Sequence, residues 1–194
     1  MHPKTNTMQR IIALDPQSAT GESKETFDAI KSQFGMVPNM MRTMGHSNAV
    51  LAGMLSFSNA LSAGSIDHVL REQIALLVAN ITGCEYCNTS HSYVSEKILK
   101  MDAETINLAK EGRALDMKSN AALQFVNSLV SSGGNITDEE FSRLIEAGFT
   151  EQAICEIIAH TGFNIFTNYF CKTMKVKPEF PISRFVERSS SVAN

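Results

Sequence analysis

Two cysteines three residues apart, with a histidine one helical turn further on, are the groups in this sequence best suited to chemistry. Cys84, Cys87 and His91 stand at positions i, i+3 and i+7, so on a helix they share one face. A C-x-x-C pair serves thiol–disulfide chemistry or metal binding. Because Gly83 is a typical helix end, we expect the pair in the first turn of a new helix, where free backbone N–H groups and the helix dipole lower the pKa of a thiol.

Glu72 is the partner that we expect for His91. If the chain reverses near Gly83, the two residues lie at similar depth in a helical hairpin, about 15 Å and about 10 Å from the turn at ~1.5 Å per residue. Glu72 shares its helix face with apolar residues, where an unpaired carboxylate is costly. The expected arrangement is a relay in which the carboxylate orients the imidazole and the imidazole accepts a thiol proton.

The cysteine pair has alternative interpretations. A thioredoxin-type site needs a βαβ unit, which this sequence does not predict, and haem attachment needs a histidine where Asn88 stands. Structural zinc needs two more ligands; Cys155 or His160 could supply them, but neither has the paired spacing of zinc sites. In a purely structural alternative, Glu72 is a solvated helix charge and His91 a packed core residue.

Composition and charge describe an ordinary globular chain. The 194 residues are 43% hydrophobic and 19% charged, with a formal net charge of -3. The chain therefore lacks a general basic surface, and we expect neither nucleic acid nor a membrane as a partner. No apolar run approaches the ~20 residues that span a bilayer, and the first residues do not resemble a signal peptide. Four cysteines are too few for a secreted disulfide scaffold, so we expect a cytoplasmic protein.

Apolar residues recur with helical spacing, and no run alternates as a strand does, so the sequence predicts an all-α fold. The expected helices cover residues 23–34, 39–62, 67–82, 84–100, 102–115, 119–131, 137–147 and 151–174. Either Ser65 or Asp67 can cap the third of them. Thr137 and Glu140 form a capping box. Length favours a single domain over residues 1–194, with an N-terminal arm at 1–22 and a disordered tail at 184–194.

Two segments 79 residues apart resemble each other. Residues 72–83 and 151–162 align without gaps and share four identities over twelve positions. This similarity predicts two related helical hairpins packed about a pseudo-twofold axis. One hairpin would carry Cys84, Cys87 and His91, and the other would contribute apolar side chains to the core.

The other sulfur-containing residues indicate packing. Cys155 and Cys171 stand alone in apolar helical sequence, where a cysteine is usually a small buried hydrophobe, so we assign them no function. The Met- and Leu-rich stripe of residues 40–61 indicates core or subunit packing. Together with the N-terminal arm, this stripe is more apolar surface than such a chain easily buries alone, which predicts a homo-oligomer.

The run from Glu72 to His91 resembles the E-x(11)-C-x-x-C-x-x-x-H signature of the alkylhydroperoxidase D-like (AhpD-like) branch of the carboxymuconolactone decarboxylase superfamily. Residues 34–39 (FGMVPN) and 46–47 (HS) are similar to its peroxidase-related subgroup, and the region after Phe149 is similar to its C-terminal half. The resemblance covers residues 23–181. It implies an AhpD-like helical fold and a homo-oligomer, often a trimer or hexamer.

The same resemblance implies a thiol-dependent peroxidase that reduces organic hydroperoxides. Cys87 would attack the peroxide and become a sulfenic acid, and Cys84 would resolve it to a disulfide and be the more exposed entry point for a reductant. His91 and Glu72 would be the proton relay. The implied partners are the hydroperoxide and a dithiol or protein reductant, with no cofactor and no metal ion.

One position departs from the pattern of the better-known members. Some carry a histidine just before the second cysteine, where this chain has Tyr86. A tyrosine can hold a water or a peroxide oxygen but is a poor base at neutral pH. The decarboxylase branch lacks the C-x-x-C pair, which argues against lactone decarboxylation. Two other function classes remain open: a redox-sensing oligomeric binding protein without turnover, and a zinc-stabilised helical assembly.

Overall fold

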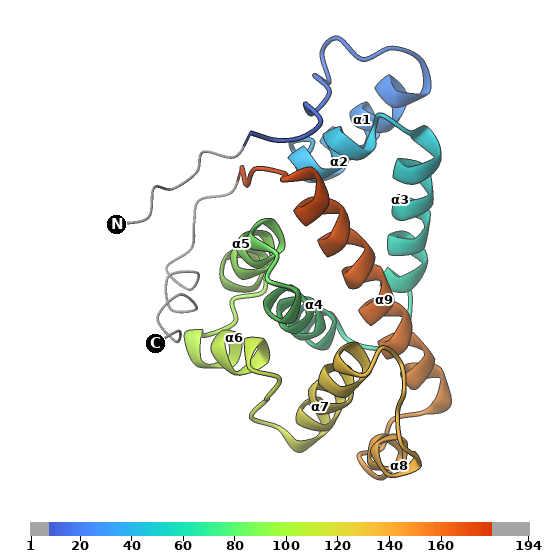
Figure 1. The fold of residues 1–194 in the computed structure, drawn as a ribbon, viewed down its shortest axis with the longest axis vertical. Coiled ribbons are helices and arrows are strands. Elements are labelled where there is room, and N and C mark those ends of the chain that lie inside the picture. Colours follow the sequence, from blue (N-terminus) through green and yellow to red (C-terminus); the bar gives the residue numbers. More distant parts are fainter. Residues whose placement is uncertain (1–7, 180–194) are drawn as a thin grey trace.

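A computed structural model describes residues 8–179, apart from the side chain of Phe34, and every regular element in that range is a helix (Figure 1). The all-α prediction is confirmed. The predicted tail at 184–194 and the first seven residues of the predicted arm lie outside the described residues. The elements are α1 (Gly21–Phe34), α2 (Asn39–Met44), α3 (Asn48–Ser62), α4 (His68–Thr82), α5 (Glu85–Tyr93), the π-helical turn η1 (Val94–Ile98), α6 (Ala103–Lys110), α7 (Met117–Ser131), α8 (Asp138–Glu146) and α9 (Glu151–Met174).

α9 lies between two groups of helices. Figure 1 shows α1, α2 and α3 on one side of it and α4 to α7 on the other. The main core forms where α4, α6, α7, α8 and α9 meet, around fully buried residues such as Ile74, Leu123 and Ile157. A second cluster surrounds Phe27 and Leu51 in the first group. Each of these side chains contributes about 1.5–3 kcal/mol by leaving water, and those of the main core fix the packing of α4 against α9.

The hairpin of α4 and α5 follows from local sequence. The Asp67 carboxylate caps α4 by accepting the backbone N–H groups of Val69 and Leu70, both at 2.9 Å. Gly83 ends α4 in the left-handed region, at φ 64°, which a side chain would disfavour. Cys84 then caps α5, so the chain reverses directly before the cysteine pair.

The structure corrects two predictions about helix continuity. The helix predicted over 39–62 breaks after Met44, because Ser47 accepts the N–H of Val50 and starts α3 as a new helix. The second predicted hairpin is absent, because α9 runs unbroken through Gly162, where its counterpart Gly83 ends α4. The helix predicted over 84–100 is present, but its second half widens into η1.

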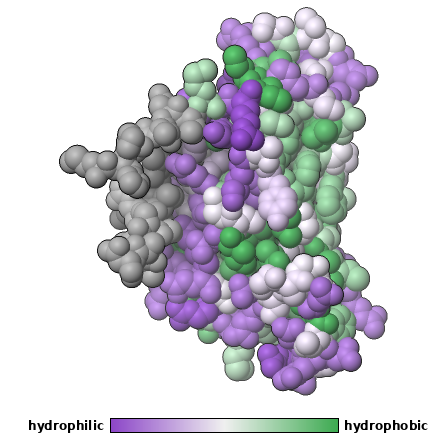
Figure 2. All heavy atoms as spheres, viewed as in Figure 1, coloured by the Kyte–Doolittle hydropathy of each residue, from purple (hydrophilic) through white to green (hydrophobic). Residues whose placement is uncertain are grey.

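Hydrophilic residues gather at the two ends of the molecule, over α1 and α8, and hydrophobic residues reach the surface between them (Figure 2). None of the helices within residues 8–179 has the length and apolarity needed to cross a membrane.

Candidate active site

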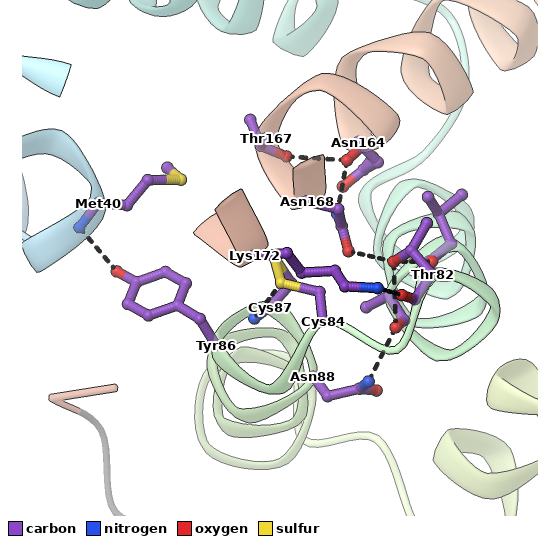
Figure 3. Close-up of a disulfide and its surroundings, with 12 residues drawn as sticks. Met40, Thr82, Cys84, Tyr86, Cys87, Asn88, Asn164, Thr167, Asn168 and Lys172 are labelled. Carbon is purple, nitrogen blue, oxygen red and sulfur yellow. Dashed lines mark hydrogen bonds between the residues drawn. A yellow bond between two sulfur atoms is a disulfide. The ribbon is translucent and has the colours of Figure 1, made fainter. Parts of the chain in front are cut away.

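Cys84 and Cys87 form a disulfide in the first turn of α5 (Figure 3), as the sequence predicts. Their Cα atoms lie 5.3 Å apart. The Cys84 sulfur also accepts the backbone N–H of Cys87 at 3.3 Å, so it serves as the N-cap of the helix. The positive end of the helix dipole therefore lies beside both sulfurs. Once the disulfide is reduced, this environment stabilises a thiolate.

His91 lies at the far end of α5 and pairs with Glu72 of α4. Its Nδ1 lies 2.8 Å from Oε1 of Glu72, which confirms the predicted contact. The side chains are 27% and 14% exposed. Burial disfavours the imidazolium, but the charge and hydrogen bond of Glu72 outweigh that cost and raise the pKa of His91. Because Glu72 occupies Nδ1, Nε2 is the nitrogen left for a thiol or a substrate.

Cys87 and His91 line the same pocket, of about 230 Å³, between α2, α3, α5, η1 and α9. The Cys87 sulfur is held in the disulfide and forms no hydrogen bond with His91 within residues 8–179. Most of the wall is apolar. The lining residues are Pro38, Met40, Met41, Met54, Ser58, Tyr86, Cys87, Ser90, His91, Val94, Phe163, Asn164 and Thr167.

The prediction that Cys84 is the more exposed cysteine is wrong. Cys84 is 1% exposed and does not line the pocket, whereas Cys87 is 4% exposed and does. The reason is the capping role of Cys84, which turns its sulfur toward the backbone of α5 and the helices behind it. In the folded chain, Cys87 is the sulfur next to the cavity.

A second cavity, of about 190 Å³, adjoins the first at His91 and is lined by Glu72, Arg71 and His160. Burial and the nearby charge of Arg71 lower the pKa of His160. The two residues suggested as additional zinc ligands do not join the cysteine pair: His160 lines this second cavity and Cys155 is exposed. The expectation that Cys155 is a buried hydrophobe is therefore also wrong.

Tyr86 stands between the two cysteines in the sequence, and its side chain points away from them toward Met40 (Figure 3). Its hydroxyl donates to Oε1 of Glu179 at 2.9 Å and accepts the backbone N–H of Met40 at 3.4 Å. Burial and the charge of Glu179 raise the pKa of Tyr86 well above its usual range. The side chain thus links α5 to α2 and to the segment after α9, and it cannot serve as a base.

Solved structures with the same arrangement of helices come from peroxidase-related proteins. An uncharacterised peroxidase-related protein from Silicibacter sp. TM1040 matches with TM-score 0.76 and 24% identity over 91% of this chain and 95% of that chain. An uncharacterised peroxidase-related protein from Ralstonia eutropha JMP134, described as an alkylhydroperoxidase AhpD core, matches with TM-score 0.79 and 20% identity over 89% and 93%. This chain has the AhpD-like fold.

The debrominase Bmp8 shares this AhpD-like fold, with TM-score 0.74 and 21% identity over 92% of this chain and 95% of that chain. One of its structures is a complex with 2,3,4-tribromopyrrole. Neither a protein-family profile nor a curated protein sequence matches the chain.

Within this AhpD-like fold, a third cysteine lies beside the disulfide. Cys171 of α9 is buried, and its sulfur lies within 4.8 Å of the sulfurs of Cys84 and Cys87. Burial and the charge of Glu179 raise the pKa of Cys171, so the thiol stays protonated. We expected no function for Cys171 from the sequence, and this contact was not predicted.

A pattern in the sequence of α9 could have indicated the position of Cys171. Asn164, Asn168 and Cys171 stand at i, i+4 and i+7, on one helix face, and all three are buried. Polar residues on a buried face are unusual unless they meet polar partners. Here the Oδ1 atom of Asn168 accepts the hydroxyl of Thr82 at 2.9 Å, at the end of α4.

Proposed function

We propose that this chain is a thiol-dependent peroxidase of the AhpD-like family, which reduces organic hydroperoxides through Cys84 and Cys87. The proposal rests on one arrangement. Cys87, which forms a disulfide with Cys84, lines the same apolar pocket as His91, whose imidazole is paired with the carboxylate of Glu72. A nucleophile, a base and an orienting group are the usual components of thiol catalysis.

Cys87 attacks the hydroperoxide because it is the sulfur beside the pocket. Its thiolate takes the distal oxygen, the O–O bond breaks, and the leaving alkoxide is protonated to an alcohol. Cys87 is then a sulfenic acid. The Cys84 thiolate attacks the Cys87 sulfur, water leaves, and the disulfide forms. The balance is one hydroperoxide and two thiols to one alcohol, one water and one disulfide. An external dithiol returns the pair to the reduced form.

His91 and Glu72 move the protons. Neutral His91 accepts the Cys87 proton at Nε2, and the resulting imidazolium is stabilised by Glu72 at Nδ1. The same imidazolium then protonates the leaving alkoxide. Because Glu72 raises the pKa of His91, the relay is a stronger base than a free histidine.

The pocket favours organic substrates over hydrogen peroxide. Three methionines, Val94 and Phe163 give it an apolar wall with room for a small hydrocarbon group. Methionine side chains adapt to different shapes, so we expect tolerance of several hydroperoxides.

Reductive debromination is the second candidate, because Bmp8 shares the fold of this chain. The apolar pocket beside Cys87 also suits a halogenated aromatic ring. Two thiols would supply the electrons: the C–Br bond becomes C–H, bromide and a proton are released, and the disulfide forms. The cysteine chemistry is therefore common to both candidates, and the substrate distinguishes them.

Turnover assays separate these functions. The reduced protein is mixed with cumene hydroperoxide, hydrogen peroxide or a bromophenol, with a dithiol as reductant, and alcohol or bromide is measured. We expect catalytic alcohol formation, faster with the organic hydroperoxide. Bromide release without peroxide turnover would favour the second candidate. Oxidation of the pair by one equivalent without turnover would favour a redox sensor.

The assembly and location are also proposed. Ile158, Phe166 and Tyr169 are 42%, 44% and 60% exposed and lie along one stripe of α9, an apolar surface that suits contact with a second copy of the chain. We expect a homo-oligomer, a trimer or hexamer, and Phe166→Glu should dissociate it. A monomer of wild-type protein by light scattering at micromolar concentration would contradict this.

We also propose a cytoplasmic location, because a dithiol cycle suits the reducing cytoplasm.

A further inference from the structure

The sulfurs of Cys84, Cys87 and Cys171 form a compact buried group. Each lies within 4.8 Å of the other two, and all three side chains are buried. Within residues 8–179 they are the only set of three or more metal-type ligand atoms that come this close. The disulfide cycle uses two of the sulfurs, which leaves Cys171 without a role.

Three sulfurs at this spacing nearly match the geometry of a metal ion bound by thiolates. With zinc–sulfur bonds of about 2.3 Å in a tetrahedral site, neighbouring sulfurs lie about 3.8 Å apart. Shifts of about 1 Å would reach that spacing. Reduction of the Cys84–Cys87 bond frees two of the sulfurs to make this movement.

The surroundings supply the other features of a metal site. The first turn of α5 places the positive end of the helix beside Cys84 and Cys87, which favours their thiolates, and the ion itself supplies the charge that stabilises the Cys171 thiolate. Cys87 lines the pocket, which gives an ion a path to the buried group. The ligands come from α5 and α9, two elements that already pack together, so binding needs no change of fold.

We propose that the reduced protein binds one zinc-class divalent ion through the thiolates of Cys84, Cys87 and Cys171. The ion displaces three thiol protons and forms three metal–sulfur bonds, and its fourth position stays open toward the pocket for water. No electrons are exchanged. The bound ion occupies both cysteines of the redox pair, so it blocks peroxide attack and disulfide formation until a chelator removes it.

Metal binding to the fully reduced chain tests this site without relying on turnover. The protein is reduced with a phosphine and titrated with Zn²⁺ against a chromophoric chelator, and with Co²⁺ as a spectroscopic substitute. We expect one ion per chain and a strong sulfur-to-cobalt charge-transfer band. The oxidised protein, with its disulfide intact, should bind neither ion at the same concentrations.

Substitution of the third cysteine identifies the ligands. Cys171→Ala should weaken binding by about tenfold or more and reduce the charge-transfer intensity by about one third, since one of three thiolates is lost. Cys155→Ala is the matched control, because it removes the exposed cysteine of the same helix and should change neither quantity. Formation of the Cys84–Cys87 disulfide in both variants checks that they fold.

Sulfur coordination can also be counted in the unchanged protein, in case Cys171→Ala does not fold. X-ray absorption of the zinc-loaded wild type should show three sulfur ligands. Two sulfurs, no stoichiometric binding, or unaltered binding by Cys171→Ala would overturn the proposal. So would a disulfide that includes Cys171 after mild oxidation, because Cys171 would then act by thiol exchange. None of these results depends on whether the protein is a peroxidase.

Discussion

Nδ1 of His91 lies 2.8 Å from Oε1 of Glu72, although 19 residues separate them in the chain. The contact fixes which ring nitrogen faces the pocket, and it raises the pKa of the imidazole. The first three predictions test this pair and the cysteines that it serves.

Glu72→Gln should slow the single-turnover reaction with hydroperoxide by about tenfold or more, because the imidazole loses its orienting carboxylate. His91→Ala should cost about 100-fold or more, as expected for loss of a general base. Because the two act as one relay, the double variant should lose much less than the product of the single losses. Independent, multiplying losses would show that Glu72 and His91 do not act together.

Replacing Cys87 and replacing Cys84 should stop the reaction at different steps. Cys87→Ser should consume no hydroperoxide, because the sulfur beside the pocket is lost. Cys84→Ser should consume about one equivalent and stop at a sulfenic acid on Cys87. Dimedone labelling followed by peptide mass spectrometry locates that product. A sulfenic acid on Cys84 in the Cys87→Ser protein would reverse the assigned roles.

The ion pair should make stability depend on pH. Folding raises the pKa of His91, so the folded state holds its proton more tightly than the unfolded chain, in which the histidine pKa is about 6.5. The stabilisation is complete below that pH and is lost as the pH rises through the higher folded pKa. Denaturant unfolding of the oxidised protein should therefore show a free energy of unfolding that falls over this range.

Glu72→Gln is the control for that pH dependence. It should remove most of the fall and lower the stability at pH 6 by about 1–3 kcal/mol, the value of a hydrogen bond to a charged group. The oxidised form is used so that Cys84 and Cys87 do not titrate. An equal slope in both proteins would assign the effect to another group.

Tyr86→Phe should affect stability more than catalysis. The hydroxyl binds Glu179 and the backbone of Met40, so its removal leaves the part-buried Met40 N–H without this acceptor and takes one donor from Oε1 of Glu179, which keeps the Asn39 N–H, at a cost of about 1–3 kcal/mol. Turnover should change less than about threefold, because the hydroxyl points away from the sulfurs. A large loss of turnover at unchanged stability would show that Tyr86 contacts the substrate.

A larger side chain at Ser58 should discriminate between substrates. Ser58 lines the pocket, so Ser58→Phe should raise KM for cumene hydroperoxide by about tenfold and leave the reaction with hydrogen peroxide nearly unchanged. Ser56→Phe, two residues away on the exposed side of α3, is the matched control. Equal effects of both substitutions would place the substrate elsewhere.

The sequence by itself determined the features that depend on local order along the chain. The glycine stop at Gly83 and the 3.6-residue period predict where α4 ends, where α5 starts and which residues share a face. That information sufficed to predict the disulfide and, by counting turns back from Gly83, the contact of Glu72 with His91. It also sufficed for the all-α fold, because no segment has the alternation of a strand.

Only the tertiary structure decided which distant side chains meet and which sulfur faces the cavity. Cys171 lies beside the pair because α9 packs against α5; the polar face that it shares with Asn164 and Asn168 indicates burial but does not identify the partner. The exposure of Cys155, the burial of Cys84 and the link from Tyr86 to Glu179 likewise depend on how helices are placed against one another. Periodicity shows which face of a helix is buried, but the partner on the other side is set by the free energy of packing the whole chain.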